Sequence, residues 1–367
     1  MKILIPVLGF GQAGGYRVLS KLANELISIG HQVDFLCPDE SRISYFPTLA
    51  IIKWVDDKGR IVLDRNKNNK KGNAFSIQRK LVKALSALSK DSYDLIIANH
   101  SLTTLPIKRA GLKHKTLYYV QAYEPDFYNL SGGLKNKILA YLSGLSYKMK
   151  FFTVVNAEIY LKYKKLRASR ILYPGIDFNL FYPGKNELKT RSKNKIIIGT
   201  IGRSEPYKGT RYIVEAFKKL KKKYATVQLH VAFGDPRDFI NEEDIFCVQP
   251  HGDKSLADFY RSLDYYFCAG YTQLGGFHYP VAEAMSCGVA VITTSYYPAN
   301  KSNAWLTKPK NIDEIVVQFD LAQSDQSLKE KKIQQALNDV KQFEWAVVGK
   351  RLNYYLGELI QLSNEKN

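Results

Sequence analysis

The stretch GYTQLGGFHYPVAEAMSCGVAVITTS, residues 270–295, decides the fold that we expect for this chain. An aromatic strand over residues 264–269 leads into a glycine-rich loop, and an apolar strand over 289–294 follows. Between them we predict a short helix that opens at Pro280 and ends at Gly288, because proline suits the first helical turn and glycine a helix end. Such a strand–loop–helix–strand unit is typical of parallel sheets, which bind ligands at the carboxyl ends of their strands.

Glu283 falls in the first turn of this predicted helix. A carboxylate in that position can accept hydrogen bonds from two vicinal hydroxyl groups, such as those of a ribose. The alternative is that Glu283 only complements the positive end of the helix dipole.

A second loop with binding chemistry lies in residues 196–209, IIIGTIGRSEPYKG. A buried strand runs into Gly202 and Arg203, and Lys208 precedes an amphipathic helix that we predict over 210–224. Arginine offers a planar, two-pronged contact and lysine a mobile point charge, so the pair suits a diphosphate. The spacing is not that of a Walker loop, so transfer from a nucleoside triphosphate is not indicated. Singly, each residue reads as a solvated surface charge; together with Glu283 they indicate a nucleotide site.

Gly202-Arg203-x4-Lys208-Gly209, followed by E-A-M-x-C-G-V-A-V-I from Glu283, resembles the retaining glycosyltransferases of family 4. The resemblance implies an α/β protein of the GT-B fold, with two Rossmann-like domains whose parallel sheets face each other across a cleft. It implies that Arg203 and Lys208 hold the donor diphosphate and act in catalysis, and that Glu283 binds the donor ribose. The donor-binding loops then also contain Gly202, Gly275, Gly276 and Phe277.

One position departs from the family pattern. The family usually has a second glutamate eight positions before Glu283, near the transferred sugar, and here that position is Gly275. We therefore expect either a different donor sugar or a loss of activity.

The first loop of the chain, GFGQAG over residues 9–14, matches G-x-G-x-x-G and opens a helix predicted over 15–29. Because Asp39 and Glu40 follow the next strand, an NAD-dependent oxidoreductase is the rival interpretation. Under the family resemblance, backbone N–H groups at Gly14 and Gly15 approach the donor diphosphate or the acceptor instead.

Three further residues are candidates in the first half. His100 follows a strand predicted over 94–98, and the resemblance implies a catalytic contact with the donor sugar. Glu124 and Asp126 can orient an acceptor hydroxyl, or can be ordinary loop carboxylates. They lie in the run YVQAYEPDFY, residues 119–128, which resembles bacterial rhamnosyltransferases of surface polysaccharide and implies a dTDP-rhamnose donor.

The net charge of +20 is concentrated in the first half, where residues 1–183 hold 28 Lys and Arg against 13 Asp and Glu. Such a surplus suits membrane headgroups, a lipid-diphosphate acceptor or nucleic acid, or it reflects general lysine usage. Cationic amphipathic stretches at 134–149 and 160–170 favour a membrane surface over nucleic acid, with helices packed on the rest of the protein as the alternative. We therefore expect a cytoplasmic protein that is peripheral on the inner face of the cell membrane.

Several classes of site and segment are not indicated. No apolar run is long enough to span a membrane, and the first residues do not read as a signal peptide. The four cysteines lack metal-ligand spacing, and there is no D-x-D pair, so we expect neither a metal nor a cofactor.

The expected organisation is an acceptor-side domain over 1–183, a nucleotide-sugar domain over 184–345 and a helix over 346–367 that crosses back. The first boundary rests on the resemblance of YPGID, residues 173–177, and FYP, residues 181–183, to the interdomain linker of the family. The expected function is transfer of a sugar from a nucleoside diphosphate sugar to a membrane-associated glycan or lipid-linked acceptor. The alternatives are the oxidoreductase and an inactive relative that only binds a glycan or nucleotide.

Overall fold

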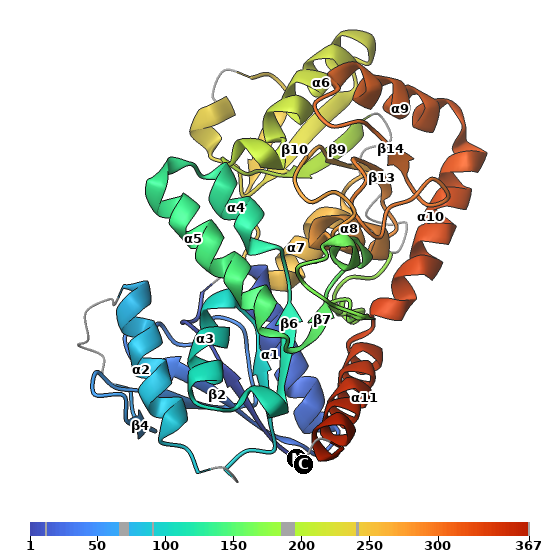
Figure 1. The fold of residues 1–367 in the computed structure, drawn as a ribbon. Helices are drawn as coiled ribbons and strands as arrows, with labels where there is room; N and C mark the ends of the chain where they lie inside the picture. The colour runs from blue at the N-terminus through green and yellow to red at the C-terminus, as the bar shows by residue number, and fades with distance from the viewer. Residues whose placement is uncertain (12, 66–72, 90–91, 185–194, 240–241, 366–367) are drawn as a thin grey trace. The chain divides into compact units, whose positions relative to one another are not determined.

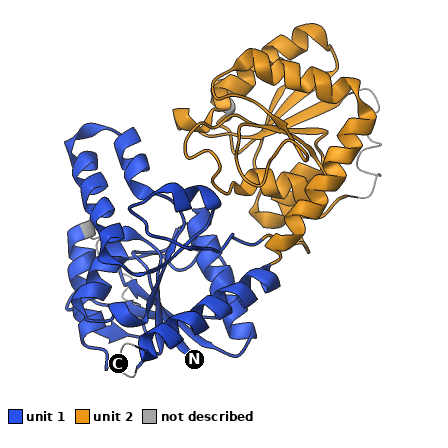
Figure 2. Ribbon diagram, turned by 45° about the vertical axis from the view of Figure 1, so that its right-hand side comes forward, with its two compact units in different colours: residues 1–175, 345–367 blue, residues 176–344 orange. Residues whose placement is uncertain are grey.

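The computed structural model describes residues 1–11, 13–65, 73–89, 92–184, 195–239 and 242–365. The chain divides into two compact units (Figure 2): unit 1 comprises residues 1–175 and 345–367, and unit 2 comprises residues 176–344. The division therefore falls after Gly175, somewhat before the position 183 at which we expected it. The last helix, α11 (Trp345–Asn364), belongs to unit 1, where it packs against α1 (Gly14–Ser28).

Unit 1 is built on an eight-stranded sheet with the order β4-β3-β2-β1-β5-β6-β7-β8 (Figure 1). Neighbouring strands are parallel except for β3 and β4, which are antiparallel. Strand β1 (Lys2–Pro6) lies at the centre, and its residues Ile3, Leu4 and Ile5 are fully buried, as expected for a strand covered on both faces. The other elements are β2 (Gln32–Pro38), β3 (Ile51–Val55), β4 (Ile61–Val62), α2 (Ala74–Ser86), β5 (Leu95–Ala98), α3 (Ser101–Arg109), β6 (Thr116–Val120), α4 (Glu124–Leu130), α5 (Gly133–Ser146), β7 (Phe152–Val155) and β8 (Arg170–Ile171).

Unit 2 is built on a six-stranded parallel sheet with the order β11-β10-β9-β12-β13-β14. Its elements are β9 (Ile196–Ile201), α6 (Thr210–Lys223), β10 (Val227–Ala232), β11 (Ile245–Val248), α7 (Gly252–Arg261), β12 (Tyr265–Cys268), α8 (Tyr279–Ser286), β13 (Ala290–Thr293), β14 (Trp305–Leu306), α9 (Ile312–Ser324) and α10 (Gln326–Val340). Helix α6 buries one apolar face that contains Ile213, Phe217 and Leu220, and its last turn carries three lysines near the negative end of the helix dipole.

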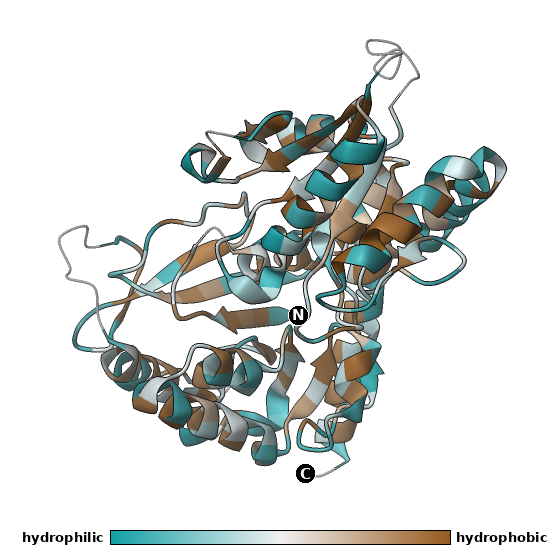
Figure 3. Cartoon of the chain, turned by 90° about the horizontal axis from the view of Figure 1, so that it is seen from above, coloured by the Kyte–Doolittle hydropathy of each residue, from teal (hydrophilic) through white to brown (hydrophobic). Residues whose placement is uncertain are grey.

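Strands and helices differ in their patterning, as Figure 3 shows: strands are largely hydrophobic, while helices carry hydrophilic residues along one side. This is the pattern of a parallel sheet whose faces are covered by amphipathic helices. Two Rossmann-like α/β units with parallel sheets are thus present, as the sequence predicted.

Some local expectations were wrong. Residues 124–128, considered as a loop, open helix α4, because Pro125 suits the first turn and two carboxylates there complement the helix dipole. The cationic stretch 160–170 does not form an amphipathic α-helix. It holds a 3-10 turn over Glu158–Lys162, and then the left-handed backbone of Arg167 (φ 51°) interrupts any helix.

Candidate functional site

The loop after β9 brings Arg203 and Lys208 to the carboxyl end of the sheet of unit 2. Gly209 ends this loop with a left-handed φ of 81°, and a Cβ there would lie 2.1 Å from the carbonyl oxygen of Ala269, so only glycine fits. The Arg203 N–H donates to the Thr210 hydroxyl oxygen at 3.0 Å, and that hydroxyl donates to the Arg203 carbonyl, also at 3.0 Å. The loop is therefore closed on the first residue of α6 and pressed against the end of β12. The N–H of Gly202 takes no part in it, because it donates to the Ala232 carbonyl at 2.7 Å.

The loop between β12 and α8 is fixed to the chain that follows β13. The N–H of Gly275 donates to the Ser295 carbonyl at 2.6 Å, and that of His278 donates to the Tyr297 carbonyl at 2.9 Å. Gly276 donates to the Gln273 carbonyl at 2.9 Å. The amides of Gly275 and Gly276 thus donate to carbonyl groups of the protein itself, one in the chain after β13 and one in the loop.

Arg203 and Lys208 share one cavity of about 170 Å³ with the residues that open α8. Phe277 also lines it, so three of the predicted donor-binding residues come together. The full lining is Thr200, Ile201, Arg203, Lys208, Ile213, Tyr266, Cys268, Phe277, His278, Tyr279 and Pro280. Among these described residues there is no carboxylate, so the cavity is electropositive.

The two cations are not equivalent. Arg203 is exposed, whereas Lys208 is half-buried. Burial, and then the charge of Arg203, lower the pKa of Lys208 below the ordinary value of a lysine. The environment of the ammonium therefore disfavours its charged form.

His278 is a residue of this cavity that the sequence analysis passed over. Its ring stacks on Tyr296, with 4.4 Å between centroids. Burial, and then the charges of Lys208 and Arg203, lower the pKa of His278 to about 3, so the imidazole is neutral at physiological pH. The signal that could have found it is the position of a histidine directly before the Tyr-Pro pair that starts the helix.

Glu283 lies differently from the prediction. Helix α8 begins at Tyr279, because the carbonyl of His278 already accepts from the N–H groups of Val281 and Ala282. Glu283 is thus beyond the first turn and does not line the cavity. Its side chain is only 2% exposed, and its carboxylate accepts a hydrogen bond from the Tyr260 hydroxyl at 3.0 Å.

Two of the predicted residues of unit 1 meet each other. His100 Nδ1 lies 3.6 Å from a carboxylate oxygen of Glu124, and the same carboxylate accepts from the Ser101 N–H at 3.0 Å and from the Ser101 hydroxyl. His100 also caps α3, because its Nδ1 accepts from the Leu102 N–H at 3.1 Å. The neutral ring therefore carries its proton on Nε2 and can donate from that atom.

The glycine-rich loop of unit 1 opens α1 at Gly14, while Gln12 lies outside the described residues. The Gln121 side-chain amide donates to the Gly15 carbonyl at 3.3 Å, so the start of α1 is tied to the chain that follows β6. Asp126, in the first turn of α4, accepts from the Tyr163 hydroxyl at 3.0 Å.

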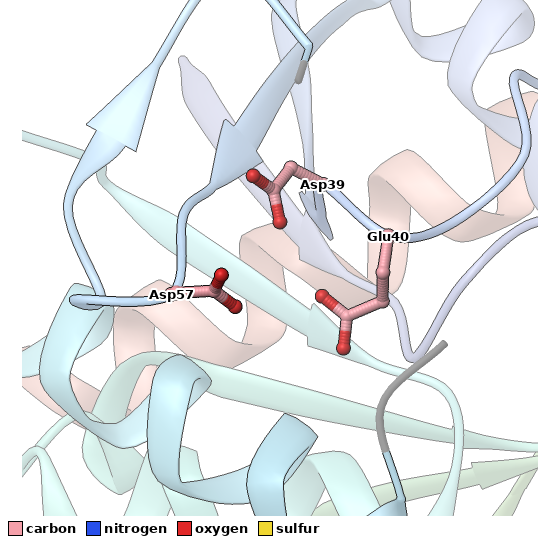
Figure 4. A group of neighbouring side chains, drawn as sticks. All are labelled: Asp39, Glu40 and Asp57. Carbon is pink, nitrogen blue, oxygen red and sulfur yellow. The ribbon is translucent and has the colours of Figure 1, made fainter. Parts of the chain in front are cut away.

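The acids that the oxidoreductase interpretation would use are part of another arrangement. Asp39, Glu40 and Asp57 come together on unit 1 (Figure 4), with oxygens close enough to hold a cation. The ammonium of Lys80 already lies 2.6 Å from Glu40 and 2.5 Å from Asp57, and Asp39 is 1% exposed. Because the Lys80 ammonium already pairs with two of these carboxylates, they are poorly available to accept hydrogen bonds from a cofactor ribose. This arrangement disfavours the oxidoreductase interpretation.

Comparison with known proteins agrees with these observations. Residues 185–339 match the model of the family described as glycosyl transferases group 1. The chain is 25% identical over 340 residues to a protein of Haemophilus influenzae named an uncharacterized glycosyltransferase, covering 87% of this chain and 90% of that protein.

Two solved structures with the same architecture match nearly the whole chain. One is sucrose-phosphate synthase from Thermosynechococcus elongatus, with a TM-score of 0.78, 16% identity, and 98% and 99% of the two chains covered. The other is Anabaena Alr3699/HepE in complex with UDP-glucose, with a TM-score of 0.71, 16% identity, and 98% and 100% covered. The fold is GT-B, and the family match supports a glycosyltransferase. In the part of the chain that the structure describes, no helix is both long and apolar enough to cross a membrane.

Proposed function

We propose that this protein transfers a sugar from a nucleoside diphosphate sugar whose diphosphate is held by Arg203 and Lys208. The observation that carries this proposal is the pairing of the two cations in one cavity whose described lining contains no carboxylate. Because burial disfavours the charged form of Lys208, an anion beside it would offset that cost. A diphosphate supplies that negative charge, and it is also the leaving group of such a donor.

Catalysis then consists mainly of stabilising the charge that develops on the departing diphosphate. A guanidinium and an ammonium fixed in place before the reaction do this without reorganisation. Their combination makes a divalent metal unnecessary for that task, which agrees with the absence of a D-x-D pair from the sequence. Retention of the anomeric configuration is the expectation that comes with the resemblance to family 4.

We infer that Glu283 binds the ribose after exchanging its partner. The Tyr260 hydroxyl donates to this carboxylate at 3.0 Å. A ribose has two vicinal hydroxyls that can donate to the same carboxylate, and we propose that they replace the Tyr260 hydroxyl once the diphosphate is bound.

For unit 1 we propose that His100 contacts the transferred sugar. The Nδ1 atom is engaged by the Leu102 N–H, so the free donor of the neutral ring is Nε2–H, which can bind a sugar hydroxyl. The Glu124 carboxylate lies 3.6 Å from Nδ1 and is held by the Ser101 N–H and hydroxyl, and we propose that it orients an acceptor hydroxyl. Gly14 and Gly15, the first two residues of α1, remain the proposed backbone contacts.

The donor that we propose is dTDP-rhamnose, on the resemblance of residues 119–128 to rhamnosyltransferases. UDP-glucose, which is bound in the HepE structure, is the natural comparison. For the acceptor we propose a membrane-associated glycan or lipid-linked molecule, reached from the inner face of the cell membrane by peripheral contact. The basic first half and the exposed apolar residues of α5 support this placement.

A thermal-shift panel of UDP, GDP and dTDP sugars tests the donor site directly. We expect a clear rise in melting temperature with one nucleotide, larger for dTDP-rhamnose than for UDP-glucose, because a ligand that binds only the folded state stabilises it. The Lys208→Met variant should lose the shift. No shift with any nucleotide sugar would refute the proposal, and binding without turnover would favour an inactive relative.

A further inference from the structure

A second cavity, of about 410 Å³, lies on unit 1 between α4, α5 and the chain near residue 165. Three lysines line it, Lys137, Lys148 and Lys165, together with Asp126 and Tyr141. None of the three lysines forms an ion pair with a carboxylate of the described residues. The cavity, called here the α5 pocket, therefore has a surplus of positive charge that the protein itself does not neutralise.

The same helix exposes an apolar stripe to solvent. Leu134, Ile138, Tyr141 and Leu142 are 76%, 51%, 68% and 47% exposed. Their spacing of four, three and one residues places them on one face of a helix. Tyr141 belongs both to this stripe and to the α5 pocket, so the apolar surface and the cationic cavity adjoin.

The α5 pocket and the stripe also lie at a position in unit 1 where ligands are commonly bound. Helix α4 starts just after the carboxyl end of β6, and open parallel sheets bind ligands along that edge. Helices α4 and α5 pack against each other and project from the rest of unit 1 (Figure 1), which leaves the stripe accessible.

We propose that the α5 pocket binds the phosphate or diphosphate group of a lipid-linked acceptor, whose hydrocarbon chain lies along the stripe. The positive charge of the α5 pocket suits a phosphate. Because Tyr141 belongs to both the pocket and the stripe, the ligand should carry an apolar chain next to that phosphate. Asp126, oriented by its hydrogen bond from the Tyr163 hydroxyl, is placed to accept from a hydroxyl of the sugar next to that phosphate. That this lipid is the acceptor of the reaction rests on the proposed function. The binding of a lipid phosphate in the α5 pocket does not depend on that function.

The test uses two pairs of substitutions that remove the same charge. The pocket pair is Lys137→Ala with Lys165→Ala. The control pair is Lys135→Ala with Lys164→Ala, which are exposed neighbours in the sequence that do not line the pocket. The full-length chain is sedimented with phosphatidylcholine vesicles that contain phosphatidic acid, or that receive the same surface charge from a fatty-acid carboxylate.

On carboxylate vesicles we expect the two pairs to weaken binding alike, since a lysine near an anionic surface contributes about 1 kcal/mol, or about fivefold, wherever it lies. On phosphatidic-acid vesicles we expect the pocket pair to weaken binding at least about fivefold more than the control pair. Equal effects of both pairs on both kinds of vesicle would overturn the proposal in favour of diffuse charge.

Two further arms separate a lipid phosphate from a free one. Calorimetry with inorganic pyrophosphate, done in the Lys208→Met background so that the proposed donor site does not bind the probe, should show weak binding that the pocket pair abolishes. Leu134→Ser with Ile138→Ser should keep pyrophosphate binding and lose vesicle binding. Unchanged vesicle binding in this stripe variant would overturn the lipid part of the inference.

The results of these vesicle experiments do not depend on whether the donor site binds nucleotide sugars. The pocket pair should bind nucleotide sugars as the wild type does, because its residues lie in unit 1 and the donor cavity in unit 2. If no nucleotide sugar binds the wild type, the proposed function fails while the vesicle result stands. If nucleotide binding is normal but the pocket pair behaves as its control, the inference fails alone.

Discussion

Replacing Lys208 with methionine removes the charge at the centre of the proposed donor site while keeping an unbranched apolar stem. At about 4 Å and an effective dielectric constant of about 20, one unit charge on a phosphate and one on an ammonium interact by roughly 4 kcal/mol. Lys208 is half-buried in a cavity of about 170 Å³, so water screens this attraction only in part. We expect turnover to fall about 10²–10³-fold, the usual loss for one such group. The exposed Arg203 should show a smaller effect.

The same substitution should not destabilise the protein. Burial and Arg203 lower the pKa of Lys208, so the folded state binds its proton less readily than the unfolded chain does. The charged lysine therefore costs stability at neutral pH, and that cost disappears as the pH rises toward the ordinary lysine pKa of 10.5. We expect Lys208→Met to unfold at the same or a higher urea concentration than the wild type at pH 7, with the difference shrinking at alkaline pH.

The assay is the slow release of nucleoside diphosphate from the best donor of the panel as water takes the sugar, so the acceptor need not be known. Lys222→Met is the matched control, because Lys222 is an exposed lysine of α6 that does not line the cavity. It should leave turnover and nucleotide affinity unchanged. A folded Lys208→Met variant with near-normal turnover would falsify the assignment of the diphosphate to this cavity.

Three other substitutions test separate parts of the structure. Glu283→Gln should weaken nucleotide affinity more than it slows turnover, because ribose hydroxyls do not react, and calorimetry showing unchanged affinity would count against the ribose contact. Gly275→Glu, which restores the usual family residue, should lower the free energy of unfolding by about 1–2 kcal/mol, because φ is 88° there; urea denaturation with equal midpoints would contradict the strain. Arg170→Gln should remove the ion pair with Glu358, whose Nε–Oε2 distance is 2.7 Å, at a cost of at most about 1 kcal/mol. Hydrogen bonding from Arg170 lowers the pKa of Glu358, so this contribution is present at neutral pH and lost as the pH falls below the ordinary glutamate range; a wild-type–variant difference in unfolding free energy that persists at low pH would argue against it.

The architecture of unit 2 could be predicted because the residues that begin and end its elements lie within those elements or next to them in the sequence. A glycine-rich loop, a proline in the first turn and a glycine after the last turn mark α8, and the predicted limits differ from the observed ones by one or two residues. The unbroken apolar runs of β12 and β13 predicted buried parallel strands, and both strands are buried throughout. In unit 1, α3 was missed, because it contains Pro106 and lacks a clear apolar period.

Only those features of the site that depend on residue type and on spacing along the chain could be predicted. Arg203 and Lys208 lie on one loop, so their meeting in one cavity follows from the loop itself. The partner of Glu283 could not be predicted, because Tyr260 comes from α7, 23 residues earlier, and only packing of α7 on α8 brings the two together. The low pKa of His278 has the same origin, since it depends on burial and on two cations from another loop.

The glycine at position 275, where the family usually has a glutamate, is better explained by a changed sugar site than by a loss of activity. The backbone at Gly275 adopts a φ of 88°, which glycine favours, and its N–H is held by the Ser295 carbonyl, so the loop is built around this glycine. A few residues on, the neutral ring of His278 brings a polar group into the cavity that carries no charge to compete with the diphosphate. A carboxylate beside Arg203 and Lys208 would offset part of their attraction for phosphate, and its replacement by a neutral group leaves that attraction intact. The loop is therefore built around a glycine at this position and places a neutral ring beside the two cations, and on this basis we expect a different donor sugar rather than a loss of activity.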